Sequence, residues 1–246
     1  MTGEEQITTG LSVLFSPGQV VELRSLGDHT RYGYYTDMDR LARDAAVIDN
    51  MPGISGIYVT LNQVNPALLS RCANRIKTAG KKEPQTGDGD IINRCWLPID
   101  IDPLRPSGIS SSDKEHTAAL NRAEIIRDYL FGLGFPDPVM ADSGNGAHLL
   151  YRIDLPNDPE SSDIVKGCLK TLDLFFSDTD CAVDTSVFNP SRIWKLYGTR
   201  SRKGDHTDER PHRVSEIIHV PEAMSVVPVS SLIQLASQLQ TDTTDK

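Results

Sequence analysis

Residues 96–105, WLPIDIDPLR, place two aspartates two positions apart within an apolar run. In a β-strand, residues i and i+2 lie on the same face of the sheet. We therefore expect Asp100 and Asp102 to project together from one face of a strand. The other face would pack into the core through the apolar residues Leu97, Ile99 and Ile101. This strand is predicted to be the centre of the fold.

The predicted carboxylate pair, Asp100 and Asp102, has two interpretations. Two like charges in a half-buried sheet repel each other, and a cation between them removes that cost. A hard divalent ion, Mg²⁺ or Mn²⁺, prefers oxygen ligands and also serves phosphate chemistry. The alternative is an edge strand with two solvated acids, because a D-x-D pattern is short and occurs often by chance. The pair alone leaves both interpretations open.

Length and composition indicate a globular protein. The 246 residues suit one large domain or two closely packed small ones. The first residues, MTGEEQITTG, lack the apolar segment of a signal peptide, and no later run is long enough to cross a bilayer. The four cysteines form no C-x-x-C pair, which argues against a zinc ribbon or a disulfide framework. We expect a soluble, cytoplasmic protein with reduced, mostly buried thiols and no membrane partner.

The charge distribution is uneven. A net charge of −9 argues against a protein that coats nucleic acid through its overall field. Residues 71–82 nevertheless carry five basic side chains and no acid, and residues 192–213 carry seven basic side chains against three acids. A solvated face is the usual explanation of such a run. A nucleic-acid contact is the alternative.

The order of the expected elements indicates the fold class. Helical spacing follows the capping pattern of Thr36 and Asp39, begins again at Pro66 and at the S-x-x-E cap of Ser112, and recurs in residues 164–175. Strands alternate with these helices early in the chain and come in pairs late. This order predicts an α+β fold with helices on one face of a mainly antiparallel sheet. A split βαβ, or RNA-recognition-motif-like (RRM-like), unit fits the same order.

A second polar motif is SGNGAH, residues 143–148. Gly144 and Gly146 would let the backbone approach a ligand and aim its N–H groups, while Ser143 and His148 add side-chain donors. This combination predicts a cradle for a triphosphate. A tight hairpin turn followed by a histidine explains the same residues, because Gly-rich turns are the default hairpin connection.

A third acid, Asp184, lies between apolar residues in CAVDTSV. It could equally cap the turn before Pro190 as an ordinary strand-end aspartate. Three carboxylates beside a phosphate cradle are, however, what two-metal phosphoryl transfer requires. Arg192 and Lys195 follow and could neutralise the phosphates of a nucleotide or of a template.

Together the three motifs resemble a known family. The order D-x-D, S-G-x-G-x-H and a later strand aspartate resembles that of the archaeo-eukaryotic primase superfamily, the primase-polymerases. Three segments are similar in sequence to the primase-polymerase domains of phages, plasmids and some CRISPR-associated proteins. They are LPIDIDPLRPSGIS, ADSGNGAHLLYRI and VDTSVFNPSRIWKLYGT. The resemblance covers roughly residues 20–221.

The resemblance implies a catalytic RRM-like sheet, a smaller α/β module and an active-site cleft between them. We expect the smaller module in residues 1–90, the catalytic module in 91–221, and a C-terminal helix with a polar linker in 222–246. Two Mg²⁺ or Mn²⁺ ions would bind Asp100, Asp102 and Asp184. The nucleotide would contact Ser143 and His148, and also Gly144 and Gly146 of the turn. It would further contact Arg192 and Lys195, the basic residues after the third motif.

The resulting hypothesis is a template-directed DNA primase-polymerase, which transfers a nucleotide from a dNTP or NTP to a 3′-hydroxyl and releases pyrophosphate. Single-stranded template would follow a basic helix at Arg71 and Arg75 and a basic loop with Arg202 and Lys203. A helicase, fused or separate, is a further expected partner. The alternatives are a metal-dependent nuclease or phosphohydrolase, and a non-catalytic single-stranded DNA-binding replication module.

Overall fold

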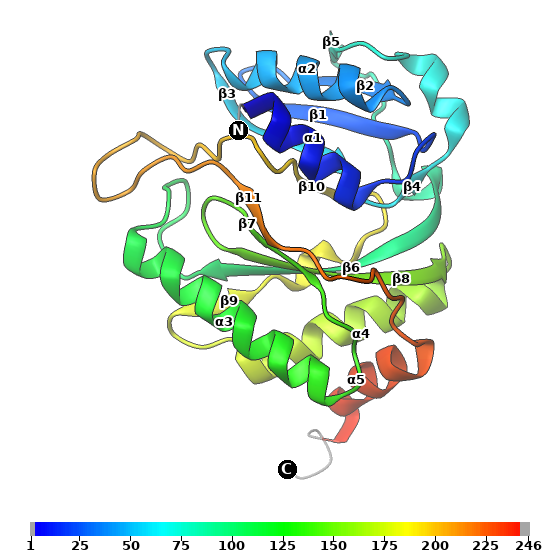
Figure 1. Ribbon diagram of the computed structural model, residues 1–246, viewed down its shortest axis with the longest axis vertical. Coiled ribbons are helices and arrows are strands. Elements are labelled where there is room, and N and C mark those ends of the chain that lie inside the picture. The colour runs from blue at the N-terminus through cyan, green and yellow to red at the C-terminus, as the bar shows by residue number, and fades with distance from the viewer. Residues whose placement is uncertain (1–2, 242–246) are drawn as a thin grey trace.

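Two antiparallel sheets stack in the middle of the molecule (Figure 1). The computed structural model describes residues 3–241. The first sheet has the strand order β10 (Ile193–Lys195), β3 (Ile54–Thr60), β1 (Val21–Gly27), β2 (Arg31–Tyr35) and β5 (Lys77–Thr78). The second has the order β11 (Glu216–His219), β7 (Val139–Asp142), β8 (Ala147–Pro156), β6 (Ile91–Pro103) and β4 (Gln63–Val64), and β9 (Cys181–Val183) pairs with β6.

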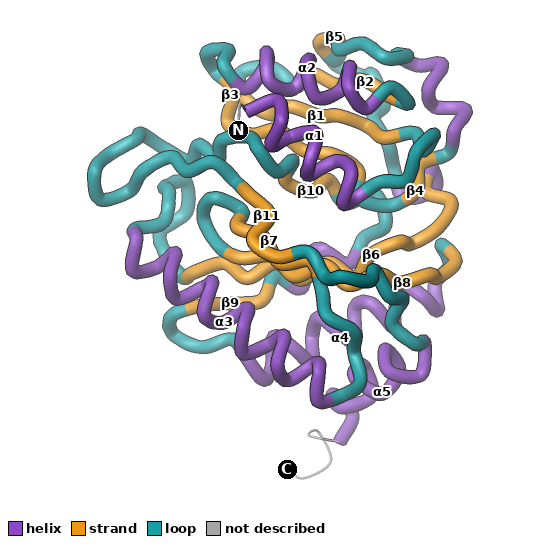
Figure 2. The backbone as a smooth tube through the Cα atoms, in the orientation of Figure 1, coloured by secondary structure: helices purple, strands orange, loops and turns teal. Residues whose placement is uncertain are grey.

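The helices lie outside the two sheets. Figure 2 shows them above and below the strands, with the helices of each sheet on its outer side. The first sheet carries α1 (Gly3–Leu14) and α2 (Met38–Asp49), and the second carries α3 (Asp113–Gly132), α4 (Pro159–Phe176) and α5 (Val229–Thr241). The predicted α+β fold is therefore confirmed.

The second sheet contains the predicted RRM-like unit. Its chain order is β6, α3, β7, β8, α4 and β9, and its strands lie in the order β9, β6, β8, β7. Two β-α-β units thus interleave around a central β6, which is the split βαβ arrangement. β6 pairs with β8 along most of its length and with β9 at its end.

Strand β6 shows the predicted alternation. Leu97, Ile99 and Ile101 are fully buried in the main core. Asp100 and Asp102 lie on the opposite face and keep part of their surface exposed. The two-residue period of a strand therefore separates the apolar support from the acids.

Helix α3 begins where its cap predicts. The Ser112 hydroxyl accepts from the Glu115 N–H, and the Glu115 carboxylate accepts from the Ser112 N–H, which is a complete capping box. Ala119, Ala123, Ile126 and Leu130 form its buried stripe. Helix α2 is capped by Asp37 instead of the predicted Thr36, since the Asp37 carboxylate accepts from the Arg40 N–H over 2.8 Å.

In the first third of the chain, one prediction is wrong and one helix was not predicted. Residues 66–71 form a 3₁₀ turn, η1 (Pro66–Arg71), and not the first turns of an α-helix. The following backbone bonds instead to β2, because Tyr34 exchanges hydrogen bonds with Cys72 and Asn74 over 2.9 and 2.7 Å. The polar N-terminal segment, for which no element was expected, forms α1 and buries Ile7, Leu11 and Leu14 at helical spacing.

Strand pairing crosses residue 90, the predicted module boundary, in both directions. Strand β4, from the first segment, pairs with β6, and β10, from the second, pairs with β3. Helix α5 packs on α4, where the Cys168 thiol and the Thr171 hydroxyl donate to main-chain oxygens of Leu232 and Leu235. The rest of the predicted polar tail, residues 242–246, lies outside the described residues.

Two predictions from composition can be compared with the structure. Within residues 3–241, every helix is too short or too polar to cross a bilayer. The four cysteines are unpaired, and all except the half-buried Cys95 are buried. The expectation of unpaired, mostly buried cysteines is confirmed.

Candidate active site

A cavity of about 280 Å³ lies between the two sheets. Leu26, Tyr58 and Trp194 line it from the first sheet, opposite β6 and β8 of the second. Most of the predicted site side chains line this one cavity: Asp100, Asp102, Ser143, His148, Asp184, Arg192, Lys195 and Lys203. Predicted residues from three distant segments, 100–102, 143–148 and 184–203, thus face one volume.

The third acid reaches the pair through strand pairing. Strand β9 runs antiparallel to the end of β6, with Val183 opposite Ile101. The next residue, Asp184, donates its backbone N–H to the Asp100 carbonyl oxygen over 2.9 Å. Its side chain also caps the 3₁₀ turn η3 (Thr185–Phe188) by accepting from the Ser186 N–H over 2.7 Å. Asp184 is therefore both the turn cap and a cavity-lining acid.

The two acids of β6 have opposite pKa shifts. Burial, followed by the charge of Asp100, raises the pKa of Asp102 above its ordinary value. Burial also acts to raise the pKa of Asp100, but His148, Lys203 and Arg192 outweigh it and hold that pKa below its ordinary value. Opposite shifts are expected for two close carboxylates that share a limited amount of positive charge.

The donor set at this site fits a hard divalent ion. Within residues 3–241, no three His, Cys, Asp or Glu side chains stand together as a preformed ligand cluster. Mg²⁺ seldom requires one, because it keeps several waters and binds one or two carboxylates plus the phosphates of a substrate. Asp100 and Asp102 offer two carboxylates from one strand face, and Asp184 lines the same cavity.

The glycine turn between β7 and β8 is a hairpin that satisfies its own backbone. The Ser143 hydroxyl accepts from the N–H groups of Asn145 and Gly146, and the Asp142 carboxylate accepts from that of Gly144. The Ser143 N–H donates to the Gly146 carbonyl over 3.0 Å. The backbone N–H groups expected to hold a phosphate are thus already engaged within the turn.

The glycines of this turn are required by packing. A Cβ on Gly146 would lie 2.3 Å from the Ile101 carbonyl oxygen of β6. Gly144 has a φ of +87°, and a Cβ there would lie 2.9 Å from Ser201. Ser143 and Asn145 are the residues of the turn that line the cavity.

Asn145 is a site residue that sequence reasoning missed. Its Oδ1 accepts from the Ser111 N–H over 2.9 Å, which fixes the orientation of the amide. The residue is only 3% exposed, and it lines the cavity. Its position inside the S-G-N-G motif is the signal in the sequence that points to it.

His148 lies between the two sheets. Its Nε2 is 3.5 Å from the Asp100 Oδ1, and its Nδ1 is 2.9 Å from the Tyr197 hydroxyl. The Trp194 ring lies against the imidazole, with 4.1 Å between the ring centroids. Strand β10 of the first sheet and the residues directly after it thus hold a histidine of the second sheet.

Lys195 is a buried cation on β10. It is 5% exposed, and its Nζ donates to the Arg200 carbonyl oxygen over 2.7 Å. Burial lowers its pKa to about 7, and the Asp49 carboxylate only partly opposes this shift. Lys195 can therefore gain or lose a proton near neutral pH.

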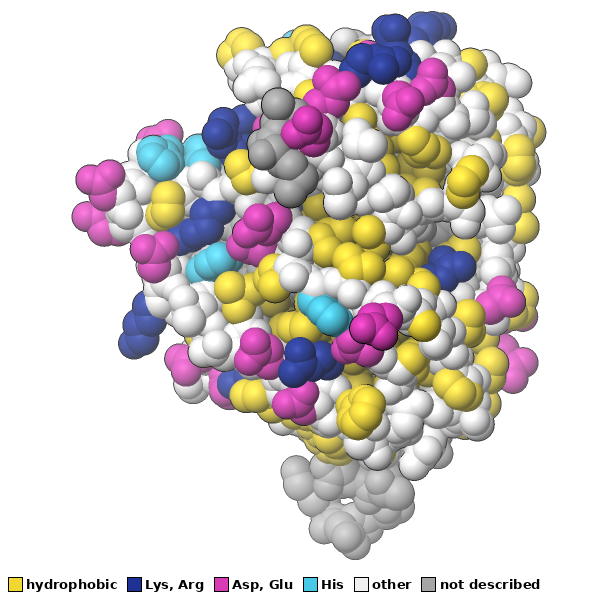
Figure 3. Space-filling view, viewed as in Figure 1, with side chains coloured by type: hydrophobic (Ala, Val, Ile, Leu, Met, Phe, Trp, Pro, Cys, Tyr) yellow, Lys and Arg dark blue, Asp and Glu magenta, His cyan; other side chains and the backbone are white. Residues whose placement is uncertain are grey.

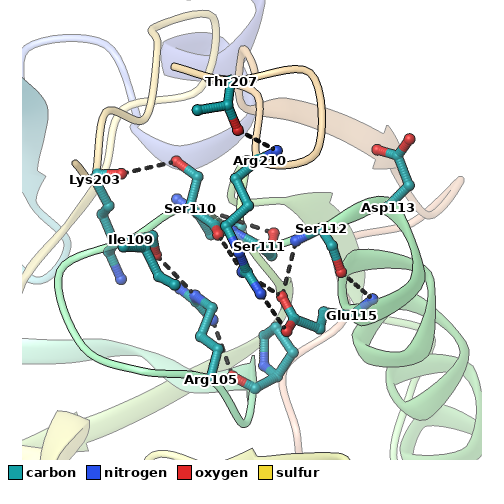
Figure 4. Close-up of polar contacts among 12 residues, drawn as sticks. Arg105, Ile109, Ser110, Ser111, Ser112, Asp113, Glu115, Lys203, Thr207 and Arg210 are labelled. Atoms are coloured by element: carbon teal, nitrogen blue, oxygen red, sulfur yellow. Dashed lines mark hydrogen bonds and ion pairs between the residues drawn. The ribbon is translucent and has the colours of Figure 1, made fainter. Parts of the chain in front are cut away.

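Lys203 enters the cavity from a loop that is fastened to the start of α3 (Figure 4). The Arg210 guanidinium donates to both carboxylate oxygens of Glu115, over 2.8 and 2.9 Å, and to the Ser110 carbonyl oxygen. The Ser110 hydroxyl donates in turn to the Lys203 carbonyl oxygen over 3.2 Å. The loop backbone that carries Lys203 is thus held by the same residues that surround the cap of α3.

Comparison with known proteins identifies the fold. No family model and no curated protein matches the sequence. The structure is similar to the crystal structure of the primase RepB′, with a TM-score of 0.51 and 11% sequence identity over 98% of this chain. The protein has a primase-like fold. Its chain spans 64% of the length of that primase, and at this identity the similarity concerns the fold.

Three residues predicted to contact nucleic acid lie outside the cavity of this primase-like fold. Arg71 donates to the Tyr34 hydroxyl and lies 3.7 Å from Asp90, and Arg75 is exposed. Arg202 forms a 2.9 Å ion pair with Asp49. On the face shown in Figure 3, Lys and Arg side chains are interspersed with Asp and Glu.

Proposed function

We propose that this protein is a template-directed primase-polymerase that transfers a nucleotide from a dNTP or NTP to a 3′-hydroxyl and releases pyrophosphate. The observation that carries the proposal is the convergence of three carboxylates and several cationic or donor side chains on one cavity between two sheets. The primase-like fold supports it. A module that only bound nucleic acid would gain nothing from acids that repel phosphate.

In this proposal Asp100, Asp102 and Asp184 hold two Mg²⁺ or Mn²⁺ ions. Bound there, the metal would lower the pKa of the attacking hydroxyl and stabilise charge at the α-phosphate. The raised pKa of Asp102 supports this role, because it reflects burial of the carboxylate and then repulsion by Asp100, and a bound cation would offset both. The backbone bond between Asp184 and Asp100 keeps the third acid beside the pair.

The triphosphate would bind opposite the acids. Ser143, Asn145 and His148 offer hydrogen-bond donors, while Arg192 and Lys195 add positive charge. The phosphates of a nucleotide would favour the protonated form of Lys195, whose pKa is about 7 in their absence. The turn glycines would contribute through close packing, since their N–H groups are engaged.

The nucleic-acid strand would enter past the loop that carries Lys203. The Lys203 side chain acts on the acid pair and also lines a second hollow, which is formed by residues 102–109. Arg71, Arg75 and Arg202 would contact only the outer phosphates, because they lie away from the cavity. Contacts of this kind weaken as salt concentration rises.

The deciding experiment is incubation of the protein with Mn²⁺, labelled dNTPs or NTPs, and single-stranded DNA with and without a primer. We expect longer products and release of pyrophosphate, and the comparison of the two sugar types identifies the substrate. Shortened DNA without pyrophosphate would identify a nuclease instead. DNA binding that is indifferent to Mn²⁺, with neither product, would identify a binding module.

A further inference from the structure

A buried tyrosine links the histidine of the cavity to a tryptophan. The Tyr197 hydroxyl lies 2.9 Å from the Trp194 Nε1 and 2.9 Å from the His148 Nδ1. The three side chains are 1%, 2% and 4% exposed, so water does not compete for these contacts. The other ring nitrogen of His148, Nε2, faces Asp100.

The positions of the hydrogens follow from what each group can donate. An indole N–H is a donor only, so the Tyr197 oxygen accepts from Trp194. Among the contacts of the described residues, His148 Nδ1 is the one acceptor within reach of the Tyr197 hydrogen. If Nδ1 carried a hydrogen instead, the tyrosine would accept twice and its own buried hydrogen would have no partner. Such an unsatisfied buried donor is costly.

We propose that Tyr197, oriented by Trp194, is a positioning residue that keeps the Nδ1 of His148 free of hydrogen, so that the ring hydrogen lies on Nε2. The Tyr197 hydroxyl donates to Nδ1, and the Nε2–H is left on the side of the ring that faces Asp100, whose Oδ1 lies 3.5 Å from Nε2. Burial raises the pKa of the Tyr197 phenol well above its ordinary value, so the hydroxyl keeps the proton that it donates.

The tautomer decides what His148 offers to a ligand, and this consequence rests on the proposed function. An Nε2–H donates to a carboxylate or to a phosphate oxygen. The other tautomer would turn an Nε2 lone pair toward the Asp100 oxygen and toward any phosphate in the cavity, which is repulsive. The tyrosine thus makes His148 a hydrogen-bond donor without requiring a positive charge on the ring.

The proposal is tested by ¹⁵N NMR of histidine-labelled protein without nucleotide or metal. The two nitrogens of a neutral imidazole differ strongly in chemical shift, and a His148→Asn variant assigns the signals. We expect the wild type to show a protonated Nε2 and a bare Nδ1. In Tyr197→Phe both signals should shift toward intermediate values, because the hydrogen bond that favours a bare Nδ1 is lost and only Asp100 still favours the Nε2–H tautomer. Tyr151→Phe is the matched control, since the buried Tyr151 hydroxyl has no partner among the described residues.

A wild-type spectrum with the proton on Nδ1 would overturn the proposal, and so would a His148 spectrum that Tyr197→Phe leaves unchanged. The wild-type spectrum gives an answer even if the variant does not fold. In the polymerisation assay, Tyr197→Phe should raise the KM for nucleotide about 2-fold to 10-fold, with a smaller effect on kcat, as the loss of one hydrogen bond implies. If the wild type shows the expected tautomer but no polymerisation, the proposed function fails while the assignment of the tautomer stands.

Discussion

The backbone N–H of Asp184 donates to the carbonyl oxygen of Asp100 over 2.9 Å. This bond continues the pairing of β9 with β6, which sets Val183 opposite Ile101. The position of the third acid beside the first therefore depends on main-chain pairing and not on the carboxylates themselves. Variants that neutralise the acids should keep the fold, which makes them suitable for testing the chemistry.

The double variant Asp100→Asn, Asp102→Asn should lose Mn²⁺-dependent nucleotide incorporation by on the order of 100-fold or more, because the metal ligands are removed. Primer extension under matched conditions measures this. Asp154→Asn is the control, since Asp154 is an exposed acid on β8 outside the cavity. Full incorporation by the double variant would refute the assignment of the acids.

Divalent metal should stabilise the wild type against heat. An ion at 100 times its dissociation constant adds about 2.7 kcal/mol of stability, which raises the Tm of a chain of this size by about 5 °C or more. Differential scanning fluorimetry with Mn²⁺ and with Mg²⁺ measures the shift. The double Asn variant should show no shift, and an equal shift in both proteins would place the metal elsewhere.

Asp102→Asn alone should leave the metal-free protein at least as stable as the wild type. The pKa of Asp102 is raised by burial and by Asp100, so its ionised form destabilises the folded state above the ordinary carboxyl pKa. The wild type should therefore lose stability relative to the variant as pH rises from about 4 toward neutrality. Denaturant unfolding across this range measures the difference. If the wild type instead became more stable relative to the variant as pH rises, the charges of Asp100 and Asp102 would already be neutralised by their neighbours.

Lys195 should make stability depend on pH in the opposite direction. Its folded-state pKa of about 7 lies below that of the unfolded chain, about 10.4, so the unfolded state binds more protons between these values. Between these two pKa values, the free energy of unfolding of the wild type should rise relative to that of Lys195→Met by up to about 1.4 kcal/mol per pH unit. Below about pH 7 the difference between the two proteins should stay constant. Lys170→Met, at an exposed position of α4, should show no such gain. If stability followed the same pH dependence in the wild type and in Lys195→Met, burial would not lower the pKa of Lys195.

Asn145→Ala should raise the KM for nucleotide about 2-fold to 10-fold, because one donor in the cavity is lost. Asn145→Asp should raise it further, since a carboxylate there would repel the phosphates. Asn93→Ala, near the start of β6 and outside the cavity, is the control. Equal KM values for wild type, Asn145→Ala and Asn145→Asp would exclude Asn145 from the nucleotide site.

Arg210→Ala should weaken single-stranded DNA binding more than it lowers stability. The Arg210–Glu115 pair is partly exposed, so its loss should change the free energy of unfolding only slightly. The loop that presents Lys203 would, however, lose one of its attachments to the start of α3, while the bonds of Ser110 and Arg213 remain. Fluorescence anisotropy at several salt concentrations, beside a denaturant melt, separates the two effects. DNA affinity that stays at the wild-type level would show that Arg210 does not position Lys203.

Local patterns in the sequence were enough to predict β6, the cap of α3 and the hairpin around residues 143–146. Each depends on neighbours within a few positions: the two-residue period of Asp100 and Asp102, or the reciprocal bonds of Ser112 and Glu115. The same patterns failed at residues 66–74, where pairing of Cys72 and Asn74 with Tyr34 replaces helical bonds.

The sequence by itself determined which residue types carry the chemistry and their order along the chain, because strand periodicity and capping act over short distances. Only the tertiary structure decided that β9 brings Asp184 beside Asp100, and that Trp194 of β10 and Tyr197 directly after it contact His148 on the other sheet. It also decided that the turn N–H groups are occupied while Asn145 faces the cavity. Contacts between distant segments depend on how the two sheets stack, which no local pattern encodes.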